Sequence, residues 1–451
     1  MVIHIEKALF SLLFILSYLY GGLAIGMGTQ DGSEKWGYIP VRPKAQMFWW
    51  YYRSPFRTQD PNNLWPIILW LQGGPGSSGV GFGNFKEIGP LDTFLNPRNS
   101  TWLKKADLLF VDNPVGVGYS FVEDETLYVR NDEEAARDLT TLLIAIFNED
   151  ESLQKSPLYI MGESYGGKYG VTLALYALKA IQAKQLNLIL GGIVLGDTWI
   201  SPEDYVASWG PLLKDISRLD NNGLKKYNSL VDEIKEQVAY GRFEDAIHIL
   251  NSLETGLQTD TNNVNFYNFL LDDDSASSTT TTQSEEAPSG DLESLMNGKF
   301  CSKMTTFLVV AIRSKLQIIP DNVKWKMQSP PVFKNMRGDF MRPRINEVDE
   351  LLKKGVDVTI YNGQLDVICA TKGTEAWVEK LKWEGLETFL SIDRTPIYCG
   401  DEKVTKGFTK SYKNLHFYWI LGAGHMVPED QPCVAFNMVG NITNSSGPAT
   451  F

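Results

Sequence analysis

The chain has few of the residues that bind metals or nucleic acids. Among its 451 residues there are four histidines and four cysteines, and no cysteine pair has the C-x-x-C spacing. Structural metal sites need closely spaced cysteine and histidine ligands, so we expect no metal centre. The net charge is −12 and no long run of lysine or arginine occurs, which argues against a surface that binds the phosphates of nucleic acid.

A dinucleotide cofactor and a membrane span are not expected either. The segment Gly116-x-Gly118 lacks the third glycine and the following helix of a dinucleotide-binding fingerprint. After about residue 26, no apolar stretch approaches the ~20 residues that a membrane-spanning helix requires. We therefore expect no cofactor and no membrane span, and the sequence leaves the oligomeric state open.

The N-terminus has the pattern of a secretory signal peptide. Lys7 precedes an apolar run over 8–20, and small residues follow, with a plausible cleavage site at Ala24-Ile25-Gly26. A membrane anchor is the alternative, but the apolar run is shorter than a bilayer span. Residues 1–26 are therefore interpreted as a signal peptide, which places the mature protein in the secretory pathway, either secreted or in a vacuolar or lysosomal compartment.

Two other patterns have meaning in a secreted chain. Three Asn-x-Ser/Thr sequons predict glycosylation at Asn99, Asn441 and Asn444. The cysteines are even in number, which permits two disulfides in three alternative pairings. They are Cys301, Cys369, Cys399 and Cys433.

The segment 162–167, with the sequence GESYGG, carries the strongest catalytic signal. It follows the short apolar run 157–160 and precedes a segment with helical periodicity over about 168–183. Gly-x-Ser-x-Gly in a strand, turn and helix context is typical of a nucleophile elbow, whose glycines let the backbone bend so tightly that the serine hydroxyl stands clear. Ser164 is thus the candidate nucleophile.

Strand-like and helix-like segments alternate along most of the chain. Short apolar runs over 66–71, 106–112, 188–195, 356–361 and 415–421 predict buried strands, and aromatic residues over 34–52 predict a strand pair. Helical spacing is found over 131–147, 345–352 and 374–381. This alternation predicts a mostly parallel, doubly wound α/β sheet, which is the architecture of an α/β hydrolase.

The character of the sequence changes after about residue 201. Residues 203–257 and 296–318 read as helical, whereas 272–290 are too polar to pack and are expected to form a disordered loop. We therefore interpret 27–200 and 331–451 as the two parts of one hydrolase core. Residues 201–330 are interpreted as an inserted, mainly helical cap.

A serine nucleophile needs a base and an orienting acid. Of the four histidines, His425 follows a predicted strand in a glycine-bearing loop, whereas His4 lies in the signal, His248 in the cap and His416 within a strand. Asp366 lies just past the strand 356–361, which fits the order Ser, Asp, His of α/β hydrolases. Ser164, Asp366 and His425 are the predicted catalytic triad.

Four motifs in this order resemble those of the serine carboxypeptidase family. They are WLQGGPG at 70–76, GESYGG at 162–167, NGQLD at 362–366 and GHMVP at 424–428. Within the family, Gln72 and the segment 196–202, GDTWISP, resemble the retinoid-inducible branch and its carboxypeptidase-like relatives. The resemblance covers about residues 35–440 and breaks only in the cap. It implies an α/β-hydrolase fold and removal of C-terminal residues from peptide or protein substrates.

The resemblance also implies roles for individual residues. The N–H groups of Gly74 and Tyr165 are expected to form the oxyanion hole. Gln72, Gly73, Glu87 and Glu163 are expected to bind the C-terminal carboxylate of the substrate. A carboxyl group can bind a carboxylate only when it is protonated, so the resemblance predicts activity that is favoured at acidic pH.

Two departures and two alternative functions remain open at this stage. Gln72 and Ser77 stand where most relatives have asparagine and cysteine, and Cys369 matches a position that is a free thiol in some relatives. An acyltransferase passes the same acyl-enzyme to an alcohol instead of water, so the triad alone does not distinguish it. A catalytically silent binding or protective protein is the other alternative, which the complete triad disfavours.

Overall fold

The protein is described by a computed structural model over residues 25–58, 60, 64–273, 304–400 and 403–450. Residues 1–24 of the predicted signal peptide, 274–290 of the predicted loop, and Cys301 lie outside these residues. Within the described ranges, no helix has both the length and the apolar character needed to cross a membrane.

One large mixed sheet organises the described chain. Its strands run in the order β1-β2-β3-β5-β4-β7-β8-β9-β12-β11-β10, and β6 pairs with β3. The parallel centre consists of β5 (Asp107–Val111), β4 (Ile67–Leu71), β7 (Pro157–Glu163), β8 (Ile189–Gly196), β9 (Val358–Gly363) and β12 (Leu415–Ile420). The antiparallel flanks are β1 (Ile25–Gly28), β2 (Glu34–Arg42), β3 (Ala45–Tyr52), β6 (Phe121–Val122), β10 (Thr395–Tyr398) and β11 (Thr405–Tyr412).

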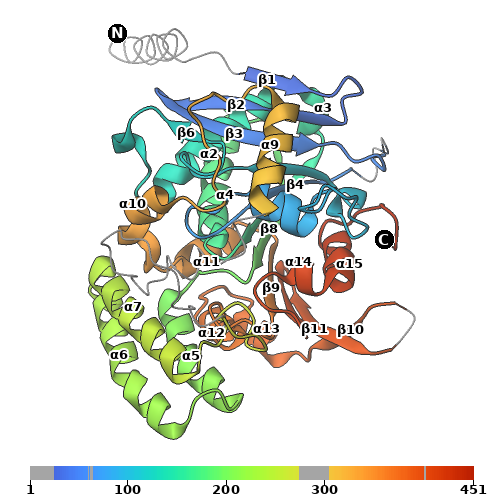
Figure 1. Cartoon of the computed structure of the whole chain (residues 1–451). Coiled ribbons are helices and arrows are strands. Elements are labelled where there is room, and N and C mark those ends of the chain that lie inside the picture. The colour runs from blue at the N-terminus through green and yellow to red at the C-terminus, as the bar shows by residue number, and fades with distance from the viewer. Residues whose placement is uncertain (1–24, 59, 61–63, 274–303, 401–402, 451) are drawn as a thin grey trace, which may run out of the picture.

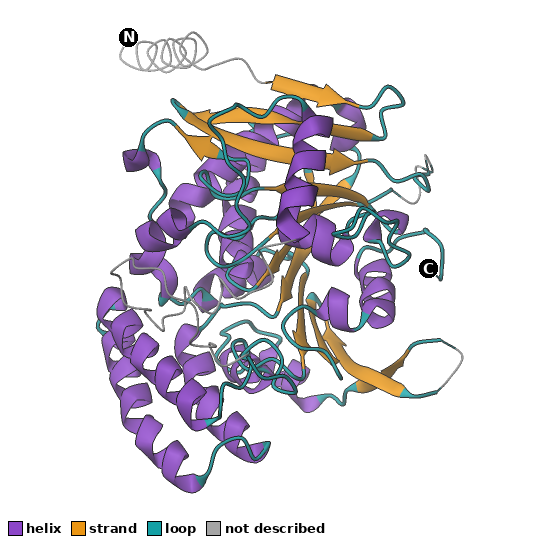
Figure 2. Cartoon of the chain, viewed as in Figure 1, coloured by secondary structure: helices purple, strands orange, loops and turns teal. Residues whose placement is uncertain are grey.

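Helices cover both faces of this sheet, as Figures 1 and 2 show. Along β4 the side chains alternate: Ile67, Leu69 and Leu71 enter one core, whereas Ile68 and Trp70 enter the other. The first core is closed by α2 (Asp132–Glu149), α4 (Gly166–Gln182) and α11 (Ile345–Lys353). The second is closed by η1 (Val80–Ile88), α9 (Met304–Leu316) and α15 (Pro432–Ile442). The predicted doubly wound α/β-hydrolase architecture is confirmed.

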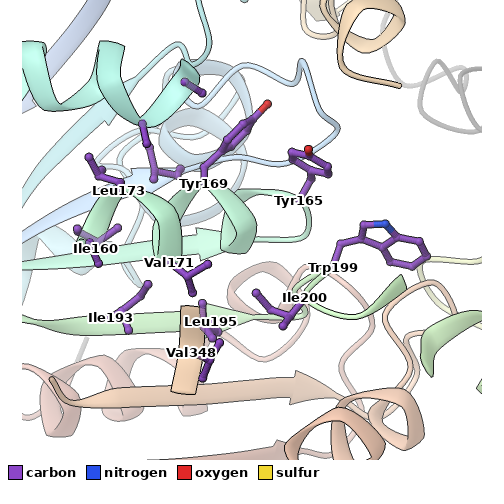
Figure 3. Close-up of a cluster of buried hydrophobic side chains, with 14 of the residues drawn as sticks. Ile160, Tyr165, Tyr169, Val171, Leu173, Ile193, Leu195, Trp199, Ile200 and Val348 are labelled. Carbon is purple, nitrogen blue, oxygen red and sulfur yellow. The ribbon is translucent and has the colours of Figure 1, made fainter. Parts of the chain in front are cut away.

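The first core holds the start of α4 in place. Figure 3 shows Tyr169 and Val171 projecting from α4 beside Ile160 of β7 and Leu195 of β8, with Trp199 and Ile200 beyond the end of β8. Ile160, Tyr169, Val171 and Leu195 are each at most 1% exposed. Burial of such side chains contributes about 1.5–3 kcal/mol each, so the turn between β7 and α4 rests on a rigid base.

Between β8 and β9 the chain leaves the sheet. There it forms α5 (Pro202–Asp215), α6 (Asn221–Ala239) and α7 (Phe243–Asp260), which lie together at the end of the molecule away from β1–β3 (Figure 1). After α9 follows α10 (Pro330–Phe340), which sequence periodicity missed. The interpretation of residues 201–330 as an inserted cap, and of 27–200 and 331–451 as the two parts of the core, stays a prediction.

The sequence also missed β10 and β11. The sequence of β11, TKGFTKSY, is largely polar and only partly buried, so it lacks the apolar alternation of a covered strand. It forms because β12 and β10 offer hydrogen-bond partners on its two sides. The small elements that remain are η2 (Trp102–Lys104), η3 (Glu125–Leu127), α3 (Glu151–Gln154), α12 (Thr371–Val378), α13 (Leu386–Ser391) and α14 (Val427–Asp430).

The cysteines do not all pair. Cys399, after β10, forms a disulfide with Cys433 at the start of α15, and Cys369 is a buried free thiol. Two intramolecular disulfides would need all four cysteines, so that alternative is wrong. The free Cys369 agrees with the family resemblance at this position.

A buried cluster of charges ties α4 to α2, to the end of α10 and to the residue before α11. The Lys168 Nζ donates to the main-chain oxygen of Asp339 at 2.6 Å and lies 3.7 Å from Asp132 Oδ2. Arg344 donates from Nε to Asp132 Oδ2 at 3.0 Å and from Nη2 to Asp339 Oδ2 at 3.3 Å. Burial raises the pKa of Asp132 to about 7, although the neighbouring Lys168 opposes the shift.

Replacing Arg344 should therefore destabilise the fold. Arg344→Ala leaves buried carboxylates without their partner, and we expect the free energy of unfolding to fall by about 3–5 kcal/mol. Lys354→Ala, which removes an exposed pair with Glu350, should change it by no more than about 0.5 kcal/mol. Chemical denaturation of both variants measures the difference, and equal midpoints would contradict this role for the cluster.

Candidate active site

Ser164 lies in a sharp turn between β7 and α4. Its φ is 59°, in the left-handed region that non-glycine residues rarely adopt. The main chain holds it there, because the Ser164 N–H donates to Gly196 O at 3.1 Å and the Trp199 N–H donates to Ser164 O at 2.9 Å. The side chain is only half-buried, so its hydroxyl is placed at the carboxyl edge of the sheet where a substrate can reach it.

Two glycines allow the neighbouring main chain to approach this turn. A Cβ on Gly73 would lie 2.6 Å from the Ser164 Cβ and 2.7 Å from the Tyr165 nitrogen. A Cβ on Gly166 would lie 2.0 Å from the Leu71 oxygen. These separations are below any van der Waals contact, so the loop after β4 and the turn after β7 touch only because both positions lack side chains.

The N–H groups of Gly74 and Tyr165, on the two sides of this contact in sequence, have no main-chain or side-chain acceptor in the described part of the chain. Gly74 has a φ of 108°, which only glycine adopts readily. Two free N–H groups beside a serine hydroxyl can stabilise a negatively charged oxygen that forms there.

His425 and Asp366 are joined at the same edge of the sheet. His425 Nδ1 lies 2.7 Å from Asp366 Oδ2, and we assign the imidazole N–H as the donor of this hydrogen bond. Asp366 Oδ1 accepts a second bond, from the Cys369 N–H at 3.1 Å. Both side chains of the pair are almost fully buried. Nε2 of His425 is thereby left as the nitrogen that can take a proton.

No hydrogen bond joins the Ser164 hydroxyl to His425 within the residues that the structure describes. Catalytic hydrogen bonds are often long before substrate binds and shorten in the complex, so this geometry is compatible with a base and its nucleophile. The topology brings the three residues to one edge, since Ser164 follows β7, Asp366 follows β9 and His425 follows β12, and these strands are parallel.

A cap segment clamps the loops of the acid and the base. The Val367 and Ile368 N–H groups both donate to Phe266 O at 3.0 Å, and the His425 N–H donates to Tyr267 O at 2.8 Å. The Tyr267 ring packs edge-on against the His425 ring, with centroids 5.0 Å apart. These contacts could not be predicted from the sequence, because main-chain acceptors have no sequence signature.

Buried acidic groups lie next to Ser164. Gln72 Nε2 donates to Glu163 Oε1 at 2.6 Å, and Trp70 Nε1 donates to Gln72 Oε1 at 2.7 Å, which fixes the orientation of the Gln72 amide. The Glu87 carboxyl, on η1, acts on the Glu163 carboxyl. Gln72, Glu87 and Glu163 are each at most 5% exposed.

Glu87 and Glu163 form a pair of buried acids. Two carboxylates offer no donor to each other, so a hydrogen bond between them would require one to be protonated. Burial and then the charge of Glu87 raise the pKa of Glu163 well above its usual range, and burial raises the pKa of Glu87. The structure thus brings together Gln72, Gly73, Glu87 and Glu163 beside Ser164.

The remaining candidate residues lie elsewhere. Asn99, Asn441 and Asn444 are all exposed, as an acceptor for glycan must be. His416 lies in β12, where its Nδ1 is 2.9 Å from the Ser411 hydroxyl, and it takes no part in the site. Sequence reasoning did not single out Asp197, whose buried carboxyl binds the end of β9.

The sheet order, the elbow and the order of the site residues define an α/β hydrolase. A solved structure of a prohormone-processing carboxypeptidase from Saccharomyces cerevisiae has this fold, with a TM-score of 0.75, 24% sequence identity and 91% of each chain covered.

Sequence comparison identifies the family within this class. The family model described as serine carboxypeptidase matches residues 26–445. The chain is 57% identical to serine carboxypeptidase-like 51 of Arabidopsis thaliana, covering 92% of this chain and 93% of the relative. It is 42% identical to the retinoid-inducible serine carboxypeptidase of Homo sapiens, covering 96% of each. The chain belongs to the serine carboxypeptidase family, as its motifs predicted.

The contact at Gly73 provides a test of the site geometry. Gly73→Ala pushes a methyl group into the Ser164 turn and the Tyr165 nitrogen, so we expect reaction with a fluorophosphonate probe to slow at least about 100-fold, as when an oxyanion donor is lost. Gly170→Ala, in α4, meets neighbours only at 3.4 Å or more and should react normally. If both variants reacted equally fast, the close contact would not matter for reactivity.

Proposed function

We propose that this protein is a serine carboxypeptidase that removes C-terminal residues from peptides through an acyl-enzyme on Ser164. The observation that carries the proposal is the buried Glu87–Glu163 pair directly before the nucleophile turn. A general esterase has no need of such a pair, whereas an exopeptidase must bind the free carboxylate at the end of its substrate.

In the proposed reaction His425 acts as the general base. Its Nε2 takes the proton of the Ser164 hydroxyl while Oγ attacks the scissile carbonyl carbon, and the N–H groups of Gly74 and Tyr165 stabilise the resulting oxyanion. The protonated His425 then gives its proton to the leaving amine, and the C-terminal residue departs. A water molecule hydrolyses the acyl-enzyme by the same steps, which restores Ser164.

Asp366 supports this cycle through its contact with Nδ1 of the imidazole. Its hydrogen bond to Nδ1 fixes the tautomer in which Nε2 is free to accept, and its charge stabilises the imidazolium that forms.

The carboxylate of the substrate is proposed to bind at Gln72, Gly73, Glu87 and Glu163. A protonated carboxyl donates a hydrogen bond to the incoming carboxylate, whereas a second ionised carboxyl would repel it. Burial of the pair keeps its proton to higher pH than an exposed acid would, so binding should be best under acidic conditions. This agrees with a secreted or vacuolar location and with glycosylation at Asn99, Asn441 and Asn444, which we also propose.

The alternative functions are less well supported. An acyltransferase needs the same acyl-enzyme, but the most similar relatives reported above are named as carboxypeptidases. A silent binding protein has no use for the hydrogen bond between His425 and Asp366 or for the strained turn at Ser164.

Removing the nucleophile tests the reaction directly. Ser164→Ala should abolish labelling by a fluorophosphonate and lower kcat/KM for a blocked dipeptide roughly 10⁴- to 10⁶-fold, because no acyl-enzyme forms. Ser152→Ala, at an exposed position, is the matched control and should keep full activity. Persistent hydrolysis by Ser164→Ala would rule out the proposed nucleophile, and ester transfer without dipeptide hydrolysis in the parent would favour the acyltransferase.

The acid pair predicts a particular dependence on pH. Above the raised pKa of the pair, KM of the parent for a blocked dipeptide should increase by about 10-fold per pH unit, because binding then requires the uptake of a proton. Glu163→Gln keeps an amide donor and no second charge, so its KM should vary much less with pH. Steady-state kinetics from acidic to neutral pH measure both, with exposed Glu379→Gln as control. Identical profiles for parent and Glu163→Gln would refute the role of the pair.

A further inference from the structure

Asp197 occupies an unusual position beside the proposed catalytic acid. It follows β8 directly and its φ is 45°, in the left-handed region that aspartate and asparagine tolerate better than most residues. Its side chain is fully buried. Burying a carboxyl group costs desolvation free energy, so the group needs hydrogen-bond partners. These partners indicate its function.

One oxygen of Asp197 binds the end of β9. Oδ1 accepts hydrogen bonds from the Gly363 N–H at 2.7 Å and from Asn362 Nδ2 at 3.0 Å. Asn362 and Gly363 are the last residues of β9, and Asp366 lies three positions after Gly363. Asp197 is therefore fixed to the segment that carries the proposed catalytic acid.

The other oxygen of Asp197, Oδ2, is buried and has no hydrogen-bond partner in the described part of the chain. Among charged groups, the Asp366 carboxyl acts most strongly on Asp197. Asp366 already accepts from His425 at Oδ2 and from the Cys369 N–H at Oδ1. Two carboxyl groups can hydrogen-bond only when one of them carries a proton, so a proton between these two would be donated from Asp197 Oδ2.

We propose that Asp197 is a positioning residue that carries a proton on Oδ2 and donates it to Asp366, so that Asp366 stays aligned with His425. The inference rests on the function proposed above. The donated hydrogen bond stabilises ionised Asp366 in its orientation toward Nδ1, and loss of that proton places two carboxylates in contact. Their repulsion then displaces Asp366 from His425 and slows the reaction at Ser164.

Electrostatics agrees with this assignment. Burial and then the charge of Asp366 raise the pKa of Asp197 well above its usual range. Other titratable groups also act on the pair from neighbouring elements. They are Glu87, Glu163, Tyr205, Tyr267, Tyr361, Cys369 and His425.

This gives the enzyme a second source of acid preference. The Glu87–Glu163 pair acts on binding of a C-terminal carboxylate, whereas Asp197 acts on the reactivity of Ser164 itself. A probe that has no carboxylate reports only the second effect. Fluorophosphonate labelling of the full chain therefore isolates Asp197 from the proposed substrate-binding acids.

The test compares labelling rates of the parent, Asp197→Asn and Asp197→Gly from about pH 4 to about pH 8. Asparagine imitates the protonated acid, since its oxygen can accept from Gly363 while its amide donates to Asp366. Glycine suits the left-handed backbone but offers no donor. Circular dichroism confirms that each variant is folded, and Ser164→Ala provides the blank.

We expect Asp197→Asn to label within about 3-fold of the parent at pH 5, and Asp197→Gly about 10-fold or more slowly, as for loss of one charge-assisted hydrogen bond. As the pH is raised, the parent should lose reactivity while Asp197→Asn retains it. If Asp197→Gly does not fold, the labelling rates of the parent and of Asp197→Asn as a function of pH decide whether the inference holds.

Two results would overturn the inference. If Asp197→Asn were at least about 10-fold slower than the parent at pH 5, an ionised Asp197 would be required. If it instead followed the parent at every pH, Asp197 would serve only to hold β9. A parent that the probe does not label, or a Ser164→Ala variant that it still labels, would contradict the proposed function and not this inference alone.

Discussion

Burial of acidic side chains at the carboxyl ends of adjacent parallel strands is the constraint on which the site depends. Glu163 ends β7, Asp197 follows β8 and Asp366 follows β9. An isolated carboxylate in such a place costs several kcal/mol, so each acid must be neutral or paired. Glu163 pairs with Glu87, and Asp366 pairs with His425 and with Asp197. The chemistry at this edge of the sheet therefore depends on which of these buried acids carry a proton.

The same constraint relates stability to pH. A buried acid whose pKa is raised on folding stabilises the protein fully only when the pH is below its unfolded pKa of about 4. This contribution to stability is lost as the pH rises through the folded pKa. Burial raises the pKa of Asp112 to about 6 and that of Asp132 to about 7, so their contributions decline over about pH 4–6 and about pH 4–7. These two buried acids and the proposed site thus favour the same acidic conditions.

Much of the site could be predicted because its residues follow strands in a fixed order. Ser164 was marked by flanking glycines, His425 by its loop, and Asp366 by its place between them. Asp197 could not be found in this way, because its meaning depends on a hydrogen bond across two strands and on a left-handed main chain. The role of Tyr267 could not be predicted either, because Tyr267 contributes a main-chain oxygen, which has no sequence signature. Polar β11 lacked any apolar pattern and exists through its neighbours.

The clamp at Phe266 and Tyr267 has a consequence for how such enzymes diversify. Their two main-chain oxygens receive hydrogen bonds from the loop of Asp366 and from the loop of His425. Residues 266–267 are therefore part of the frame that sets the distance between acid and base. Exchanging this segment for that of a relative would change the alignment of the acid and base along with the segment itself.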